Sequence, residues 1–222
     1  MSEYFRLEGP VQPPASSGRA KQLVVLAHGV GADGNDLIGL APHWGRLLPD
    51  AEFVSPHAPF PCDFAPFGRQ WFSLMDRSPH AILAGVRAAT PILGAFLDEA
   101  LAERGLAGDA LALVGFSQGT MLSLYVGLRR GEPPAAILGY SGALVGAESL
   151  TDEIAGRPPV LLVHGDADEV VPVESLLVAE QVLEAHDIPV ETHVRPGLGH
   201  GIDDWGLRRG GAFLAGALGV AP

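Results

Sequence analysis

The stretch Leu-Ala-Leu-Val-Gly-Phe-Ser-Gln-Gly-Thr-Met, residues 111–121, decides the fold of this chain. An apolar run ends in Gly-x-Ser-x-Gly and continues as a helix-compatible sequence, which predicts a strand that bends sharply into a helix. Gly115 and Gly119 flank the turn, where side chains would collide with the neighbouring strand and helix. The turn would hold the hydroxyl of Ser117 above the sheet, beside the free N–H groups of the helix. We therefore expect a nucleophilic serine that forms covalent esters, as in hydrolases and acyltransferases.

The composition is that of a folded protein of one domain and disfavours several kinds of partner. A length of 222 residues, with 47% apolar and 18% charged residues, suits one α/β domain with a continuous core. The net charge is −12 and no Lys/Arg cluster occurs, so we expect no nucleic-acid partner and no attraction to anionic membranes. Cys62 is the only cysteine, which excludes an internal disulfide and a cysteine-based zinc site.

The N-terminal 22 residues are polar and rich in Pro and Gly, without the pattern of a signal peptide. We find no apolar run close to the ~20 residues that span a bilayer. The expectation is a cytoplasmic protein with no stable membrane insertion.

Apolar runs alternate with helical patterns along the rest of the chain, which predicts a mostly parallel central sheet with helices on both faces. We expect an α/β fold in which residues 1–22 are an N-terminal segment of the same domain as residues 23–222. The expected strands are residues 23–28, 51–55, 110–115, 135–140, 160–164 and 190–195. The expected helices are residues 36–48, 80–104 with a kink at Pro91, 118–130, 174–186 and 203–218.

One long segment, residues 56–79, interrupts this alternation. Loops of this length inside a domain are usually functional or disordered, and the aromatic content argues against disorder. We interpret the segment as a wall over a binding cleft, and the alternative is a loop that only packs on the surface. The candidate substrate-binding side chains are Phe64, Phe67, Trp71 and Phe72.

A serine nucleophile needs a base, and the base needs a carboxylate that orients it. In α/β-hydrolases these residues follow in the order serine, acid, histidine. Asp168 follows one predicted strand and His200 follows the next, so both open onto the same sheet edge as Ser117. Asp166 is the alternative acid and His57 the alternative base.

The first predicted strand ends in His-Gly-Val-Gly-Ala-Asp-Gly, residues 28–34. Acyl transfer needs two donors directed at the developing oxyanion. One is the backbone N–H of Gln118, and we assign the second to the N–H of Val30 in this Gly-rich turn. The alternative is an ordinary strand-to-helix turn.

Four of these motifs together resemble the phospholipase/carboxylesterase family, which includes acyl-protein thioesterases and bacterial carboxylesterases. The motifs are residues 28–34, 115–119, 164–172 and 199–200, and residues 55–59 and 69–73 are also similar to family motifs. The resemblance implies a single-domain α/β-hydrolase fold with Ser117, Asp168 and His200 as the triad. It also implies Val30 and Gln118 as the oxyanion residues and Trp71 near the acyl pocket. Thr120 stands where eukaryotic members more often carry glycine or alanine.

The expected activity is hydrolysis of carboxylic esters with small to medium acyl chains through an acyl-enzyme. The substrate is a small-molecule ester or thioester, and the chemistry needs no cofactor and no metal. No His-Glu-x-x-His motif and no P-loop occurs. The alternatives are an acyl-protein thioesterase or lysophospholipase and, more distantly, a non-catalytic binding protein of the same fold. The oligomeric state stays open, with a homodimer as one alternative.

Overall fold

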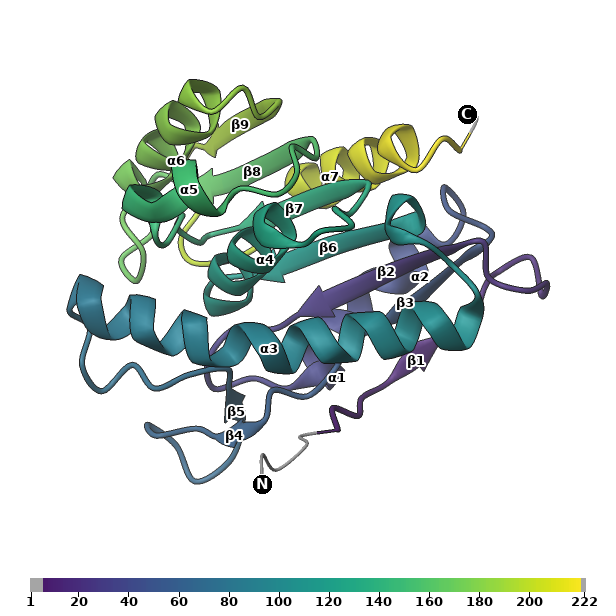
Figure 1. The fold of residues 1–222 in the computed structure, drawn as a ribbon, viewed down its shortest axis with the longest axis horizontal. Helices are drawn as coiled ribbons and strands as arrows, with labels where there is room; N and C mark the ends of the chain where they lie inside the picture. The colour runs from purple at the N-terminus through teal and green to yellow at the C-terminus, as the bar shows by residue number, and fades with distance from the viewer. Residues whose placement is uncertain (1–5, 221–222) are drawn as a thin grey trace.

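The computed structural model describes residues 6–220 and contains a seven-stranded sheet with helices on both faces (Figure 1). The strands are β1 (Val11–Gln12), β2 (Gln22–Ala27), β3 (Ala51–Val54), β6 (Leu111–Phe116), β7 (Ala136–Tyr140), β8 (Val160–Gly165) and β9 (Val190–Arg195). They lie in the order β1-β3-β2-β6-β7-β8-β9. β1 is antiparallel to β3 and the other neighbouring pairs are parallel, so most strands end at one edge of the sheet.

Helices cover the sheet from both sides because the strands are apolar on both faces. They are α1 (Gly34–Leu37), α2 (Ala41–Trp44), α3 (Pro79–Arg104), α4 (Gln118–Arg129), α5 (Leu150–Glu153), α6 (Glu174–Ala185) and α7 (Asp204–Ala217). Short 3-10 helices are η1 (Ile38–Leu40), η2 (Gly108–Ala110) and η3 (Ala147–Ser149).

Successive side chains of β2 show which helices share a face of the sheet. Leu23 and Val25 pack in one core cluster with α3 and α4. Val24 and Leu26 point to the opposite face and pack in a second cluster with α2 and α7. A third cluster joins α4, α5 and α6 over β7 and β8. The sheet is therefore the middle of three layers, with α3, α4 and α6 in front of it in Figure 1.

The predicted fold class is confirmed, and the predicted strands agree with β2, β3, β6, β7, β8 and β9 to within one residue at each end. The prediction of one helix over residues 36–48 is wrong, since α1, η1 and α2 follow one another there. Pro42 has no N–H to continue the hydrogen-bond ladder, which explains the interruption. The strand β1 was not predicted, because two residues carry no period.

Segment 56–79 is not a structureless loop. It contains the antiparallel strands β4 (Phe60–Pro61) and β5 (Arg69–Gln70), which form a second small sheet. This hairpin lies beside the N-terminal half of α3, below the main sheet in Figure 1. The segment is thus ordered by backbone pairing, which its sequence pattern did not reveal.

The helix α3 is one continuous element of 26 residues with Pro91 inside it. Ser78 caps its start by accepting the N–H of Ala81, and Gly105 ends it in the left-handed conformation. By length and apolar composition alone α3 would be able to cross a bilayer, which corrects the expectation that no segment would. Its buried residues, among them Leu93 and Leu97, pack in the core, as expected of a helix that covers a sheet.

Candidate active site

Ser117 lies at the sharp turn between β6 and α4 in a conformation that few non-glycine residues adopt. Its φ is 53° and its ψ is −116°, and its N–H donates to the main-chain oxygen of Tyr140 at 2.9 Å. A Cβ at Gly119 would lie 1.8 Å from the oxygen of Ala27, and one at Gly115 would lie 2.4 Å from the N of Thr120. At both glycines of the Gly-x-Ser-x-Gly pattern, another part of the backbone lies too close for any side chain. The strained turn is the one that the sequence predicts.

Thr120 is accommodated in the first turn of α4 by one glycine on the neighbouring strand β7 and one just after that strand. Its hydroxyl donates to the oxygen of Tyr140 at 2.9 Å and accepts the N–H of the same residue at 3.1 Å. A Cβ at Gly139 would lie 2.5 Å from the Thr120 methyl group, and one at Gly142 would lie 2.4 Å from its Cβ. The Thr120 hydroxyl therefore ties α4 to β7 through the backbone of Tyr140.

Asp168 and His200 are hydrogen-bonded to each other, with Oδ2 and Nδ1 2.7 Å apart. The side chain of Asp168 is fully buried, and its Oδ1 accepts the N–H groups of Val170 and Val171 at 2.9 Å each. Burial raises the pKa of this carboxyl, but the hydrogen bonds from His200 and the two N–H groups outweigh it, so the pKa lies below its ordinary value. Asp168 is therefore held as a carboxylate.

Asp166, the alternative acid, lies in the same loop as Asp168 but has a different hydrogen-bond partner. Its Oδ1 accepts the N–H of Gly197 at 2.6 Å. This bond ties the loop after β8 to the turn after β9, which carries His200. Asp166 thus braces the loop, whereas Asp168 contacts the imidazole.

The imidazole of His200 lies beside the nucleophile turn. Its ring centroid is 4.8 Å from that of Phe116, the residue before Ser117. No hydrogen bond joins Ser117 Oγ to His200 within residues 6–220. The structure thus brings Asp168 to His200 directly and brings His200 to the turn that carries Ser117.

The turn after β2 lies against the nucleophile. A Cβ at Gly29 would lie 3.4 Å from the Cβ of Ser117. The Nδ1 of His28 lies 2.7 Å from the Gly29 oxygen, and its Nε2 accepts the N–H of Ala58 at 3.0 Å. Burial lowers the pKa of His28, so this ring is neutral and its proton resides on Nδ1.

The fixed carbonyl of Gly29 also fixes the direction of the next N–H. In a planar trans peptide the C=O and the following N–H point in opposite directions. Because the His28 ring binds the Gly29 carbonyl, the Val30 N–H points away from that ring. In the described part of the chain, neither this N–H nor the Gln118 N–H at the start of α4 has a hydrogen-bond partner. Both predicted oxyanion donors are therefore free to bind an anion.

His57, the alternative base, accepts the N–H of Gly34 at 3.0 Å through its Nδ1. Asp33 caps the same short helix, α1, by accepting the N–H of Asn35 at 2.8 Å. These contacts anchor the residues that follow the oxyanion turn. No contact of His57 with Ser117 is present among the described residues, so the structure favours His200 as the base.

The four aromatic side chains predicted to line a cleft do not form one wall. Trp71 and Phe72 are buried, whereas Phe64 is 52% and Phe67 is 77% exposed. The main-chain N–H of Trp71 donates to the side-chain oxygen of Gln118 at 2.8 Å, and the side-chain amide nitrogen of Gln118 donates to the main-chain oxygen of Phe72 at 2.8 Å. The segment thus braces the start of α4, and contact of these side chains with substrate stays a prediction.

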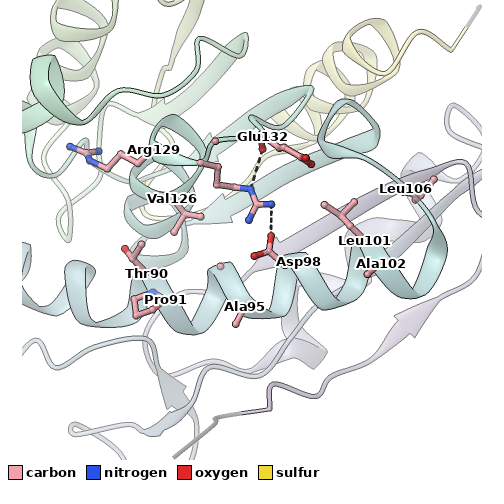
Figure 2. A pocket seen from close by; sticks show the side chains of 13 residues that line it. Thr90, Pro91, Ala95, Asp98, Leu101, Ala102, Leu106, Val126, Arg129 and Glu132 are labelled. Atoms are coloured by element: carbon pink, nitrogen blue, oxygen red, sulfur yellow. Dashed lines mark hydrogen bonds and ion pairs between the residues drawn. The ribbon is translucent and has the colours of Figure 1, made fainter. Parts of the chain in front are cut away.

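One cavity lies away from these residues. It has a volume of about 770 Å³ and is located between the outer side of α3 and the C-terminal half of α4 (Figure 2). Thr90, Pro91 and Ala95 line one side and Val126 the other. None of the predicted site residues lines it. Within residues 6–220 no group of three or more His, Cys, Asp or Glu is arranged to hold a metal ion.

The family model for phospholipase/carboxylesterase matches residues 11–216. The esterase YpfH of Escherichia coli K12 is 30% identical over 205 residues, which cover 91% of this chain and 83% of that protein. Acyl-protein thioesterase 1 of Gibberella zeae is 26% identical over 212 residues, which cover 88% of this chain and 89% of that protein.

Solved structures show the same fold. The crystal structure of esterase PE8 is 47% identical with a TM-score of 0.92, covering 96% of this chain and 99% of the other. The Bacillus cereus carboxylesterase is 16% identical with a TM-score of 0.76, covering 96% and 95%, and shows likeness of fold alone. The match to the family model over residues 11–216 shows that the chain belongs to the phospholipase/carboxylesterase family and is an α/β-hydrolase.

Proposed function

We propose that the protein hydrolyses carboxylic esters of small to medium acyl chains, with Ser117, His200 and Asp168 as its catalytic triad. The observation that carries the proposal is the 2.7 Å hydrogen bond between Asp168 and His200, on loops at the sheet edge where Ser117 occupies its strained turn. Asp168 is a carboxylate and accepts a hydrogen bond from the Nδ1–H of His200, which leaves Nε2 unprotonated to act as a base.

The first half of the reaction forms an acyl-enzyme. His200 Nε2 takes the proton of Ser117 as Oγ attacks the carbonyl carbon, and the carbonyl oxygen becomes an oxyanion. The N–H groups of Val30 and Gln118 bind this oxyanion, and removing one such donor typically costs ~3–4 kcal/mol of transition-state stabilisation. The C–O or C–S bond then breaks, and the leaving group takes the proton from His200.

The second half restores the enzyme. Water enters the position of the leaving group, and His200 takes a proton from it as its oxygen attacks the acyl carbon. A second oxyanion forms in the same place, the bond to Ser117 Oγ breaks, and His200 returns the proton to the serine. Asp168 remains ionised throughout and stabilises the imidazolium.

For the acyl group we propose a position along segment 56–79, with Phe64 and Phe67 as its exposed apolar contacts. A thioesterase acting on acylated proteins is the second candidate, because curated relatives at 26% identity are named acyl-protein thioesterases. An alcohol and a thiol leave through the same sequence of steps, so the triad does not distinguish the two. A cytoplasmic location also stays a prediction.

The test is a series of nitrophenyl esters from acetate to palmitate, together with a palmitoyl thioester, on the wild type and on Ser117→Ala. We expect the highest kcat/KM on short and medium esters and loss of activity in the variant. A fluorophosphonate probe should label the wild type at Ser117 only. Absence of both turnover and labelling would refute a catalytic role, and preference for the palmitoyl thioester would favour the second candidate.

A further inference from the structure

A second histidine lies behind the carboxylate of Asp168. His164 is the penultimate residue of β8, and its side chain is 1% exposed. Its Nε2 lies 2.8 Å from the main-chain oxygen of Val171 and 3.3 Å from Oδ2 of Asp168. No role for His164 is predicted from the sequence, because its contacts are with Asp168 and Val171 of the loop that follows β8.

The partner of His164 determines which ring nitrogen carries the proton. A carbonyl oxygen only accepts hydrogen bonds, so Nε2 must be protonated to donate to Val171. The same N–H edge of the ring also faces Oδ2 of Asp168. Oδ2 is therefore close to two imidazoles, that of the half-buried His200 and that of the fully buried His164.

We infer that His164 is a positioning residue for the reaction: its Nε2–H fixes the turn over residues 168–171 and the plane of the Asp168 carboxylate, and through them orients His200. The inference rests on the proposed function. The two backbone N–H groups that Oδ1 accepts belong to Val170 and Val171, and His164 holds the carbonyl of Val171. The carboxylate is thus contacted at Oδ1 by the N–H groups of its own turn and at Oδ2 by the two imidazoles.

His164 acts through Asp168 and touches no reacting atom. Partners one step removed from a catalytic group commonly orient it, and a shift of about 1 Å in the base costs roughly 100-fold in rate. Without His164 the Val171 oxygen would be buried without a donor, and the carboxylate would lose its contact with the His164 ring. We expect kcat to fall roughly 10- to 100-fold with little change in KM.

The variants His164→Gln and His164→Phe separate positioning from packing. The Gln amide nitrogen is as many bonds from Cα as Nε2 of histidine and keeps the donor, whereas Phe keeps a ring and has no donor. We expect His164→Gln to retain most of the wild-type kcat and His164→Phe to lose it. The melting temperatures of the two variants show whether a loss of kcat comes from a loss of stability. If both variants lose activity in parallel with stability, or if Phe keeps the wild-type kcat, the inference is wrong.

A measurement on the wild-type protein remains available if a variant does not fold. In protein with ¹⁵N-labelled histidine, NMR reports which ring nitrogen of His164 is protonated and whether His200 has the downfield Nδ1 proton of a bond to a carboxylate. We expect the proton of His164 on Nε2, and weakening of the His200 signal in His164→Phe only. Protonation of His164 on Nδ1 instead would overturn the inference. Neither signal depends on turnover, so a lack of esterase activity would count against the proposed function alone.

Discussion

The indole N–H of Trp71 donates to the main-chain oxygen of His28 at 2.9 Å, and the two rings lie 5.6 Å apart. His28 is the residue whose ring holds the carbonyl of Gly29, next to the proposed oxyanion donor of Val30. Segment 56–79 therefore supports the turn that carries the predicted oxyanion donor. Gly31 and Ala32 of that turn also pair with the backbone of Arg69, at 2.9 and 2.8 Å.

The variant Trp71→Phe tests this support. It keeps an aromatic ring and removes the donor, so we expect a loss of about 1 kcal/mol of stability and a roughly 10-fold lower kcat with KM nearly unchanged. Urea unfolding and steady-state kinetics on a short nitrophenyl ester measure the two effects. Phe67→Ala is the control for stability, because this side chain is 77% exposed and its removal should leave the free energy of unfolding within about 0.5 kcal/mol. An unchanged kcat in Trp71→Phe would show that the oxyanion turn does not need this bond.

The sequence predicted those parts of the fold and site that have local signals. Apolar runs predicted the strands, because parallel strands buried on both faces are continuously apolar. The Gly, His or Asp residues at the ends of these runs predicted the edge of the sheet at which the site lies. The Asp168–His200 pair was predicted from its order after Ser117. The contact of Trp71 with His28 spans 43 positions and has no local pattern, so the sequence did not distinguish the buried Trp71 from the exposed Phe67. His164 was overlooked because its contacts form only when the acid loop folds back on β8.

Asp168 and Asp166 offer a matched pair for testing the triad. Asp168→Asn removes the charge that holds the tautomer of His200, and we expect kcat to fall by about 10⁴-fold with the fold retained. Asp166→Asn keeps an oxygen that can accept the Gly197 N–H, so its kcat should remain close to that of the wild type. Kinetics and the rate of fluorophosphonate labelling measure both variants. Equal losses in the two variants would argue that the loop matters as a whole and not through Asp168.

The close backbone approach at Gly119 predicts intolerance of a single methyl group. A Cβ there would meet the oxygen of Ala27 at 1.8 Å, so Gly119→Ala must displace α4 or β2. We expect about 3 kcal/mol of destabilisation and loss of esterase activity. Gly94 in α3 has no atom within 4 Å of its Cβ position, so Gly94→Ala should stabilise the protein by about 0.5–1 kcal/mol. Thermal unfolding of both variants checks the prediction, and a wild-type melting temperature for Gly119→Ala would contradict it.

Glu153 contributes stability that depends on pH. Its carboxylate pairs with Arg129 at 2.6 Å and Arg87 at 3.0 Å and accepts the hydroxyl of Ser149 at 2.8 Å, between η3, α5 and the helices α3 and α4. The hydrogen bond from Arg129, followed by that from Ser149, lowers the pKa of Glu153 to about 2. Because the pKa is lower in the folded state, the stabilisation is fully present above the unfolded value of 4.5 and is lost as the pH falls from there toward about 2.

The variant Glu153→Gln should therefore be destabilised at neutral pH and resemble the wild type in acid. We expect a loss of about 2 kcal/mol at neutral pH, since Arg129 is largely buried and would keep its charge with one partner fewer. The difference between variant and wild type should shrink as the pH is lowered through about 4 to about 2. Urea unfolding at several pH values measures it, with Glu148→Gln on the exposed side of η3 as the control. A difference that stays constant across this range would mean that Glu153 acts through packing and not through its charge.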